Sequence, residues 1–300
     1  MLKKLSGAVL ALALAAMLPT PAQAKPATAT AACAIQAGSV TSAGNLKWQG
    51  LQATTPPITY TQRTTALGLF QPGQVRLAGP LDFDGGDSDV PLTQVANVVI
   101  GSSMYNVQFL VNREDDKAVQ VQSQRIGSGW DRFVAFEQST RRRYQYALRD
   151  DGTLMRWSVK NDIHNLQTWT ALGSAPGFGS VKTMTLISET ATYDTLLANT
   201  RGGALYTVRI PVAKTMKPVV TKVRTSTWQG FERLLTARCG QYGTLLLGID
   251  KDNGAGYLYA VGHATGATTV IKALGKVPST FTDPVDARAL WADTPALNGE

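Results

Sequence analysis

Trp130 and Asp131 stand side by side in the stretch RIGSGWDRFVAF and offer two groups that a sugar-binding site uses. An aromatic face packs against the C–H surface of a pyranose ring, and a fixed polar group beside it hydrogen-bonds the hydroxyls. Trp228 and Gln229 repeat this pairing in TSTWQGFERLL. We therefore predict that these four side chains bind a ligand, although a tryptophan that packs between two sheets explains the same pattern.

An acidic run in DFDGGDSD has the spacing that a hard cation such as calcium uses, with glycines that let the chain bend around an ion. The run lacks the closing glutamate of an EF-hand, and acidic turn chemistry explains it equally well. Calcium is thus the one cofactor that the sequence leaves open. The candidate ligands are Asp82, Asp84, Asp87 and Asp89.

Groups suited to catalysis are few. Glycan-cleaving enzymes need paired carboxylates, but Glu137, Glu189 and Glu232 fall at unequal distances from the repeated motif described next. The two histidines, His164 and His263, stand in loop-like stretches and form no zinc-binding cluster in the sequence. We therefore expect a binding protein rather than an enzyme and assign no catalytic residue. A glycan hydrolase stays as an alternative.

Two motifs recur along the chain with one period. The first places a large apolar residue before a strand-like run, with separations of 49, 48, 50 and 53 residues. The second follows about 25 residues later and reads as an apolar run, a polar turn and an alternating run, which is typical of a β-hairpin. The first motif is centred on Leu81, Trp130, Phe178, Trp228 and Phe281.

Aromatic residues also recur in the hairpin motif. Tyr105, Tyr206 and Tyr259 are assigned to one position of the hairpin, and Met155 stands there in another copy. We predict that these tyrosines line the ligand sites, with packing in the core as the alternative interpretation.

Each repeat of about 50 residues holds four strands, which predicts an all-β fold: a five-bladed β-propeller of four-stranded blades. After Phe281 only one strand, PVDARALWAD, remains, whereas AGNLKW near residue 45 copies a hairpin without a preceding anchor. We therefore expect the N- and C-terminal segments to share the last blade, which removes two exposed sheet edges. The role of residues 49–75 is left open, with a loop over one rim as one interpretation.

The segments IGSGWDRFVAF, DGTLMRW and NLQTWTALGSAPGF resemble the repeats of the tachylectin-2-like propeller lectins. The match is best over residues 125–178, and later copies differ, with Gly179 and Gln229 where Asp131 stands. The resemblance implies five blades and binding of N-acetylated sugars in pockets between adjacent blades, without metal or catalysis. Because the copies have diverged, we expect fewer working pockets than blades.

The first residues have the features of a secretory signal peptide: Lys3 and Lys4, a short apolar run and the small residues before Ala24. We predict a leader over residues 1–24, a flexible tail over 25–32 and a single propeller domain over 33–298. The apolar run is too short to cross a bilayer, so no membrane span is expected.

Two cysteines, Cys33 and Cys239, remain in a chain that we expect to reach an oxidising compartment. A disulfide between the shared blade and its neighbour is predicted, and two buried free thiols are the alternative.

The formal net charge of +8 is spread along the chain, and only Arg141, Arg142 and Arg143 form a basic run. We interpret that run as a solvated turn, because it lacks the aromatic neighbours on which nucleic-acid bases stack. The sequence thus predicts a secreted, monomeric, lectin-like protein whose partner is a glycan or cell-wall polysaccharide. A scaffold for protein partners is the second hypothesis.

Overall fold

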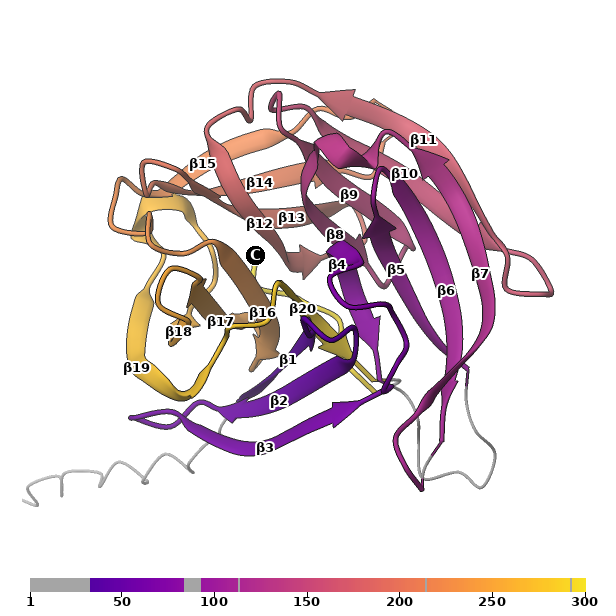
Figure 1. Cartoon of the computed structure of the whole chain (residues 1–300). Coiled ribbons are helices and arrows are strands. Elements are labelled where there is room, and N and C mark those ends of the chain that lie inside the picture. The colour runs from indigo at the N-terminus through magenta and orange to yellow at the C-terminus, as the bar shows by residue number, and fades with distance from the viewer. Residues whose placement is uncertain (1–32, 84–92, 113, 214, 292) are drawn as a thin grey trace, which may run out of the picture. The chain divides into compact units, whose positions relative to one another are not determined.

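The computed structural model describes residues 33–83, 93–112, 114–213, 215–291 and 293–300. These ranges hold twenty β-strands and two three-residue 3₁₀ helices, and Figure 1 labels the strands in chain order. The expected all-β fold of four-stranded antiparallel sheets is confirmed. The leader and tail predicted for residues 1–32 lie outside the described residues. Within the described ranges, no helix is long and apolar enough to cross a bilayer.

Four groups of four consecutive strands follow one another along the chain, each a meander; the first is half of an eight-stranded sheet, the other three are separate sheets, and all four are called sheets 1 to 4 here. Sheet 1 comprises β4 (Val75–Asp82), β5 (Gln94–Ile100), β6 (Ser103–Val111) and β7 (Ala118–Ser128). Sheet 2 comprises β8 (Phe133–Ser139), β9 (Tyr144–Arg149), β10 (Leu154–Asn161) and β11 (Gln167–Ala175). Sheet 3 comprises β12 (Val181–Glu189), β13 (Tyr193–Thr200), β14 (Leu205–Pro211) and β15 (Val219–Arg224). Sheet 4 comprises β16 (Arg233–Cys239), β17 (Gly243–Asp250), β18 (Ala255–Val261) and β19 (Ile271–Thr280).

A further group of four strands, called here the shared sheet, combines distant parts of the chain. β20 (Val285–Leu290) pairs antiparallel with β1 (Ala34–Val40), followed by β2 (Leu46–Gln52) and β3 (Ile58–Thr65). In Figure 1 the yellow β20 accordingly lies beside the indigo β1. β20 also pairs parallel with the end of β4 over two residues, so the shared sheet is continuous with sheet 1.

The segment whose role the sequence left open, residues 49–75, completes the shared sheet. It contains the end of β2, the outer strand β3 and the connection to β4. Since β3 is paired with β2 over most of its length, the interpretation of this segment as a loop over one rim is wrong.

The fourth strand of each sheet is its least buried strand. In sheet 3, eight of the nine residues of β12 are buried, whereas four of the six residues of β15 are exposed. First strands with apolar residues on both faces must be covered by neighbouring sheets. Contacts between first strands meet this need: β4 contacts β8, β8 contacts β12, β12 contacts β16, β16 contacts β1 and β20, and β20 contacts β4.

A single backbone hydrogen bond recurs between consecutive sheets. A large aromatic residue just before each first strand, called here the anchor, donates its N–H to a carbonyl in the hairpin turn of the preceding sheet. Five such bonds of 2.9–3.1 Å occur among the described residues. The donor and acceptor pairs are Phe70 and Gly44, Trp130 and Ser102, Phe178 and Gly152, Trp228 and Gly203, and Phe281 and Gly254.

This bond corrects one predicted anchor. Leu81 lies inside β4 and is fully buried, whereas Phe70, 11 residues earlier, makes the anchor hydrogen bond. The connection within sheet 1 from the end of β4 at Asp82 to the start of β5 at Gln94 is longer than its counterparts in sheets 2 to 4, so counting back a constant period from Trp130 placed the anchor too late in the chain.

The glycines that accept these bonds are required by geometry. Gly152 and Gly203 have φ of 80° and 81°, a backbone conformation that disfavours residues with a β-carbon. A β-carbon at Gly203 would also approach the backbone nitrogen of Trp228 to 3.0 Å. These turns therefore combine a left-handed backbone with close contact to the next sheet.

Candidate functional site

The two tryptophans predicted to bind ligand are buried. Trp130 and Trp228 are each 5% exposed. Trp130 packs against Phe133, Trp157 and Trp169, with ring centroids 4.4, 5.5 and 5.9 Å away. Its ring contributes to an apolar cluster that includes Leu77 and Val99 of sheet 1. Both rings are therefore covered by protein, which agrees with the interpretation of tryptophan as packing between sheets.

The polar residues that follow the tryptophans are exposed. Asp131 lies in the 3₁₀ helix η1 (Trp130–Arg132). Burial of the Arg76 guanidinium lowers its pKa, and the negative charge of Asp131 opposes this shift without cancelling it. Arg76 donates to the carbonyl oxygens of Trp130 and Phe133 and so joins sheet 1 to the start of sheet 2. The backbone oxygen of Gln229 accepts a hydrogen bond from Lys182.

The anchor hydrogen bonds give a common register for the tyrosines. Tyr105 and Tyr206 each stand three residues after the turn residue that accepts the anchor bond, and Tyr257 occupies that position in sheet 4. Tyr259 stands two residues further on, at the position that Trp157 occupies in sheet 2. The prediction that Tyr259 shares the position of Tyr105 and Tyr206 is therefore wrong by two residues, the period after which side chains return to the same face of a strand.

Tyr206 lines a pocket of about 330 Å³ on sheet 3. The walls come from the connection between β11 and β12 and from strands β13, β14 and β15. Most of the lining residues have apolar side chains, and the lining residues with polar side chains are Ser180, Thr200 and Tyr206. The ammonium of Lys222 lies 5.8 Å from the centre of the Tyr206 ring. Other residues that line this pocket, called here the Tyr206 pocket, are Pro176, Phe178, Val208, Pro218 and Val220.

One position beside this pocket distinguishes sheet 3 from sheets 2 and 4. Five residues after the turn acceptor, sheet 2 carries Trp157 and sheet 4 carries Tyr259, and these rings lie 5.5 Å from Trp130 and 4.8 Å from Trp228. Sheet 3 carries the smaller Val208 at this position, and its anchor is Phe178 rather than tryptophan. Sheet 3 therefore lacks the large ring that packs on the anchor in sheets 2 and 4, and Val208 and Phe178 both line the Tyr206 pocket.

Of the four aspartates predicted as calcium ligands, only Asp82 lies in the described part of the chain; Asp84, Asp87 and Asp89 lie outside it. Asp82 lines a pocket of about 440 Å³ between the ends of β4 and β8. The described residues contain no cluster of three histidine, cysteine or acidic side chains that could hold a metal ion.

The three glutamates considered for catalysis lie in separate polar networks. Glu137 is 4% exposed and accepts hydrogen bonds from Thr185 and Arg288. Burial raises the pKa of its carboxyl, and the neighbouring Arg288 opposes that shift. Glu232 accepts from Lys182 at 2.8 Å and from the backbone N–H of Lys251 at 2.8 Å.

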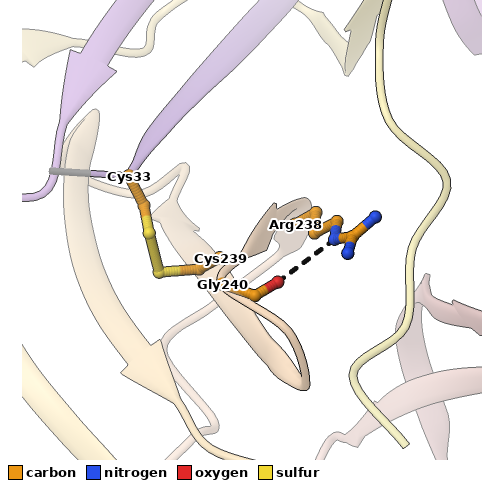
Figure 2. Close-up of a disulfide and its surroundings, with 4 residues drawn as sticks. All are labelled: Cys33, Arg238, Cys239 and Gly240. Atoms are coloured by element: carbon orange, nitrogen blue, oxygen red, sulfur yellow. Dashed lines mark hydrogen bonds between the residues drawn. A yellow bond between two sulfur atoms is a disulfide. The ribbon is translucent and has the colours of Figure 1, made fainter. Parts of the chain in front are cut away.

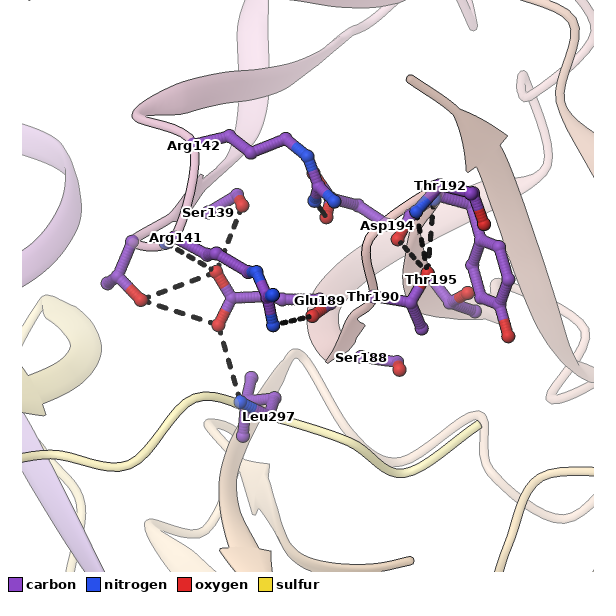
Figure 3. A network of polar contacts seen from close by, with 12 residues as sticks. Ser139, Arg141, Arg142, Ser188, Glu189, Thr190, Thr192, Asp194, Thr195 and Leu297 are labelled. Atoms are coloured by element: carbon purple, nitrogen blue, oxygen red, sulfur yellow. Dashed lines mark hydrogen bonds and ion pairs between the residues drawn. The ribbon is translucent and has the colours of Figure 1, made fainter. Parts of the chain in front are cut away.

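Glu189 forms the centre of the network in Figure 3. Its carboxylate accepts hydrogen bonds from Ser139 at 2.9 Å, the N–H of Arg141 at 3.0 Å and the N–H of Leu297 at 3.3 Å. It thereby ties the β8–β9 turn of sheet 2 to sheet 3 and to the last residues of the chain. All three carboxylates are thus engaged by protein donors in interfaces between sheets.

The same network corrects the interpretation of the arginine run. Arg142 donates to Asp194 at 2.5 Å, and its side chain is 13% exposed. Asp194 also accepts from the hydroxyl of Tyr146 at 2.7 Å, and burial raises the pKa of its carboxyl. Arg141 and Arg143 are exposed, but Arg142 lies in the interface between sheets 2 and 3.

The predicted disulfide between Cys33 and Cys239 is present. The two Cα atoms lie 5.3 Å apart, and the bond joins the residue before β1 to the end of β16 (Figure 2). The described residues contain no free cysteine. The bond therefore connects the shared sheet covalently to sheet 4, as predicted.

The chain matches no protein-family model and no curated protein sequence.

Proposed function

We propose that the five groups of four strands are the blades of a five-bladed β-propeller, with the shared sheet as the fifth blade. Three observations support this arrangement: the order of contacts between first strands, the five anchor hydrogen bonds, and the pairing of β20 with β1. The contact order returns from β20 to β4, which is the behaviour of a ring rather than of an open row. A crystal structure with another number of sheets around the axis would refute this arrangement.

We propose further that the protein acts outside the cell as a lectin-like module that binds carbohydrate without cleaving it. The observation that carries this proposal is the Tyr206 pocket, because it lies at a repeated position of the fold where the neighbouring sheets are filled. Its volume falls in the range of ~300–1,000 Å³ that small-molecule sites occupy. The disulfide supports an extracellular location, since such bonds persist in oxidising compartments.

The chemistry of the pocket favours an N-acetylated sugar. Apolar walls at Phe178, Val208 and Val220 suit an acetyl methyl group, and the hydroxyls of Ser180 and Tyr206 suit the amide and ring hydroxyls. The resemblance to the tachylectin-2-like lectins points to the same class of ligand. A single pocket of this kind binds weakly, so a polymer with many identical sugars would bind better than one sugar.

The test is binding of N-acetylglucosamine and its oligomers, measured by titration calorimetry or saturation-transfer NMR. Val208→Trp introduces the side chain that sheet 2 carries at the equivalent position, and it is expected to fill the pocket and lower affinity by about tenfold or more. Tyr206→Phe removes one hydroxyl and is expected to weaken binding by a smaller factor, about threefold to tenfold.

Tyr105→Phe is the matched control, because Tyr105 occupies the position of Tyr206 in sheet 1 and does not line this pocket. It is expected to bind like the wild type. If Val208→Trp folds normally and binds as well as the wild type, the ligand is not in this pocket. If no saccharide on a broad array binds at all, the lectin proposal fails and a scaffold for protein partners becomes the better hypothesis.

A further inference from the structure

A second pocket lies at the opposite end of the first strands from the anchors. It has a volume of about 400 Å³ and is formed by the start of β1, by β2 and β3, by the ends of β16 and β20, and by residues that follow β20. None of its lining residues belongs to the Tyr206 pocket. The side chains that matter for its chemistry are Gln36, Trp48, Tyr60, Arg238, Trp291 and Asp293.

The ring of Tyr60 lies flat across the shared sheet. A β-carbon at Gly50 would collide with this ring, so the glycine provides the space in which the ring lies. The hydroxyl of Tyr60 is held by the amide of Gln36 on β1, two strands away. Tyr60 is nevertheless 48% exposed, so one part of a fixed aromatic ring faces solvent. A fixed, exposed ring is a stacking surface for the C–H face of a sugar.

Two half-buried tryptophans form another wall. Trp291 lies 5.2 Å from Trp48 at 79° and stacks on Phe83 at 5.5 Å and 21°. These contacts fix both indoles at an angle to each other. Since Trp48 and Trp291 pack directly together, they do not leave the gap between rings that a methylated ammonium group would need, and we therefore favour a sugar.

Polar groups in the pocket include both donors and acceptors. Oε1 of Gln36 is buried and has no hydrogen-bond partner in the protein. Arg238 uses Nε to donate to the backbone oxygen of Gly240 at 3.1 Å, and Figure 2 shows its guanidinium extending away from the disulfide. Asp293 is exposed and forms no ion pair with Arg238.

The charges that line the pocket balance. Arg288 is paired with Glu137, which leaves one cation, Arg238, and one carboxylate, Asp293, from different segments. A neutral ligand with many hydroxyls can use both as hydrogen-bond partners, whereas an acidic ligand would face Asp293 and a basic ligand would face Arg238. Aromatic surfaces with mixed donors and acceptors are therefore most complementary to a neutral pyranose.

We infer that this pocket is a second binding site for a neutral saccharide, with Tyr60 as the stacking surface and Gln36, Arg238 and Asp293 as hydrogen-bonding groups. The disulfide holds the site together, since Cys33 directly precedes the β1 wall and Cys239 directly follows Arg238. The inference does not rest on the Tyr206 pocket, because different residues form the two sites.

The experiment titrates the full chain with three neutral oligosaccharides, cellotriose, laminaritriose and chitotriose, and follows tryptophan fluorescence and calorimetric heat. At least one of them is expected to change the emission of Trp48 and Trp291 and to bind with Kd of about 0.1–10 mM. Tyr60→Ala and Arg238→Ala are each expected to weaken that binding by about tenfold. Ile58→Ala is the matched control, because Ile58 is 45% exposed on the same strand and does not line the pocket.

The variants also separate this site from the Tyr206 pocket. Binding that survives Val208→Trp but is lost in Tyr60→Ala supports the second site. Binding that is lost in Val208→Trp and kept in Tyr60→Ala overturns the inference while supporting the proposed function. The inference is also overturned if none of the three probes binds at about 10 mM, or if Tyr60→Ala and Ile58→Ala weaken binding equally.

Reduction of the disulfide gives an independent readout. Reduced protein that keeps its circular dichroism spectrum is expected to bind the same oligosaccharide about threefold or more weakly, because the walls on β1 and β16 are no longer joined. Unchanged affinity in folded, reduced protein would contradict the role given to the disulfide. If reduction unfolds the protein, Tyr60→Ala and Arg238→Ala decide the inference by themselves.

Discussion

Glu137 and Arg288 form a buried ion pair between sheet 2 and the shared sheet, with Oε2 of the glutamate 3.2 Å from Nε of the arginine. Both side chains are about 4% exposed, and Arg288 also donates to the backbone oxygen of Gln138 at 2.8 Å. The pair joins β8 to β20, 151 positions apart in the chain. It is thus one of the polar contacts that fix the C-terminal strand in the fold.

Arg288→Met is expected to destabilise the protein by about 3–5 kcal/mol at neutral pH, because it leaves a buried carboxylate without its cation. Burial already raises the pKa of Glu137, and loss of Arg288 removes the group that opposes this shift. A raised pKa contributes stability at low pH that is lost as the pH rises through it. The loss in free energy of unfolding caused by Arg288→Met should therefore increase from about pH 4 to pH 8, as measured by denaturant titrations.

The double variant Glu137→Leu with Arg288→Met tests the same ion pair by removing both of its charges. Because neither charge remains, the double variant is expected to recover about 2 kcal/mol or more relative to Arg288→Met alone. A double variant as unstable as the sum of the single variants would show that the two residues act independently.

Gly203→Ala is expected to lower stability by about 2 kcal/mol or more. The substitution places a β-carbon at φ of 81° and forces it against the backbone of the next anchor, Trp228. Gly202→Ala in the same turn meets no atom within 4 Å and serves as the control, with an expected change below about 1 kcal/mol. Thermal unfolding of both variants measures the difference, and equal losses would argue against the anchor contact.

The ion pair of Glu232 with Lys182 predicts a pH dependence of opposite sign. Burial raises the pKa of Glu232, but the hydrogen bonds from Lys182 and Lys251 outweigh it, and the net shift is downward. The resulting stability is present above the ordinary glutamate pKa and is lost as the pH falls through the lowered value.

Glu232→Gln should therefore cost about 0.5–1 kcal/mol at pH 7, and the cost should vanish near pH 3. The measurement is the difference in denaturation midpoint between the variant and the wild type across this range. A deficit that is constant with pH would mean that packing of the side chain, and not its charge, stabilises the interface.

Removal of the disulfide by Cys33→Ser with Cys239→Ser is expected to destabilise the protein by up to about 5 kcal/mol, the chain-entropy value for a loop of this length. The two cysteines are separated by 206 positions, so the bond restricts most of the unfolded chain. Guanidinium titrations of the oxidised, reduced and double-serine proteins give the value. Agreement between the reduced and the double-serine proteins is the control for the substitution itself.

Much of the strand pattern could be predicted from local sequence. The strand after Trp130, the hairpin at Gly152 and the outer strand at TWTALG correspond to β8, to β9 and β10, and to β11. The joining of PVDARALWAD to the N-terminal strands was also predicted, because a count of strands left one group incomplete. These predictions rest on local signals, namely glycines in turns and the alternation of apolar and polar residues along strands.

The details of the candidate site depend on register and neighbouring side chains, which a period does not supply. Phe70 was missed because the connection between β4 and β5 is longer than its counterparts, and Tyr259 was misplaced by two residues within its hairpin. The signal that could have found Phe70 is the glycine two residues before it, Gly68, which has counterparts one residue before Trp130 and Phe178 in Gly129 and Gly177. Val208 carried no signal of its own, because a valine in a strand is ordinary until it is compared with Trp157 and Tyr259 at the same position.

The pairing of β20 with β1 has a consequence for biosynthesis. As the ribosome releases the chain from its N-terminus, β1, β2 and β3 emerge early, but their partner β20 is translated about 250 codons later. The shared sheet therefore lacks β20 while the strands of sheets 1 to 4 are synthesised. The shared sheet can therefore be completed only after Leu290 has left the ribosomal exit tunnel.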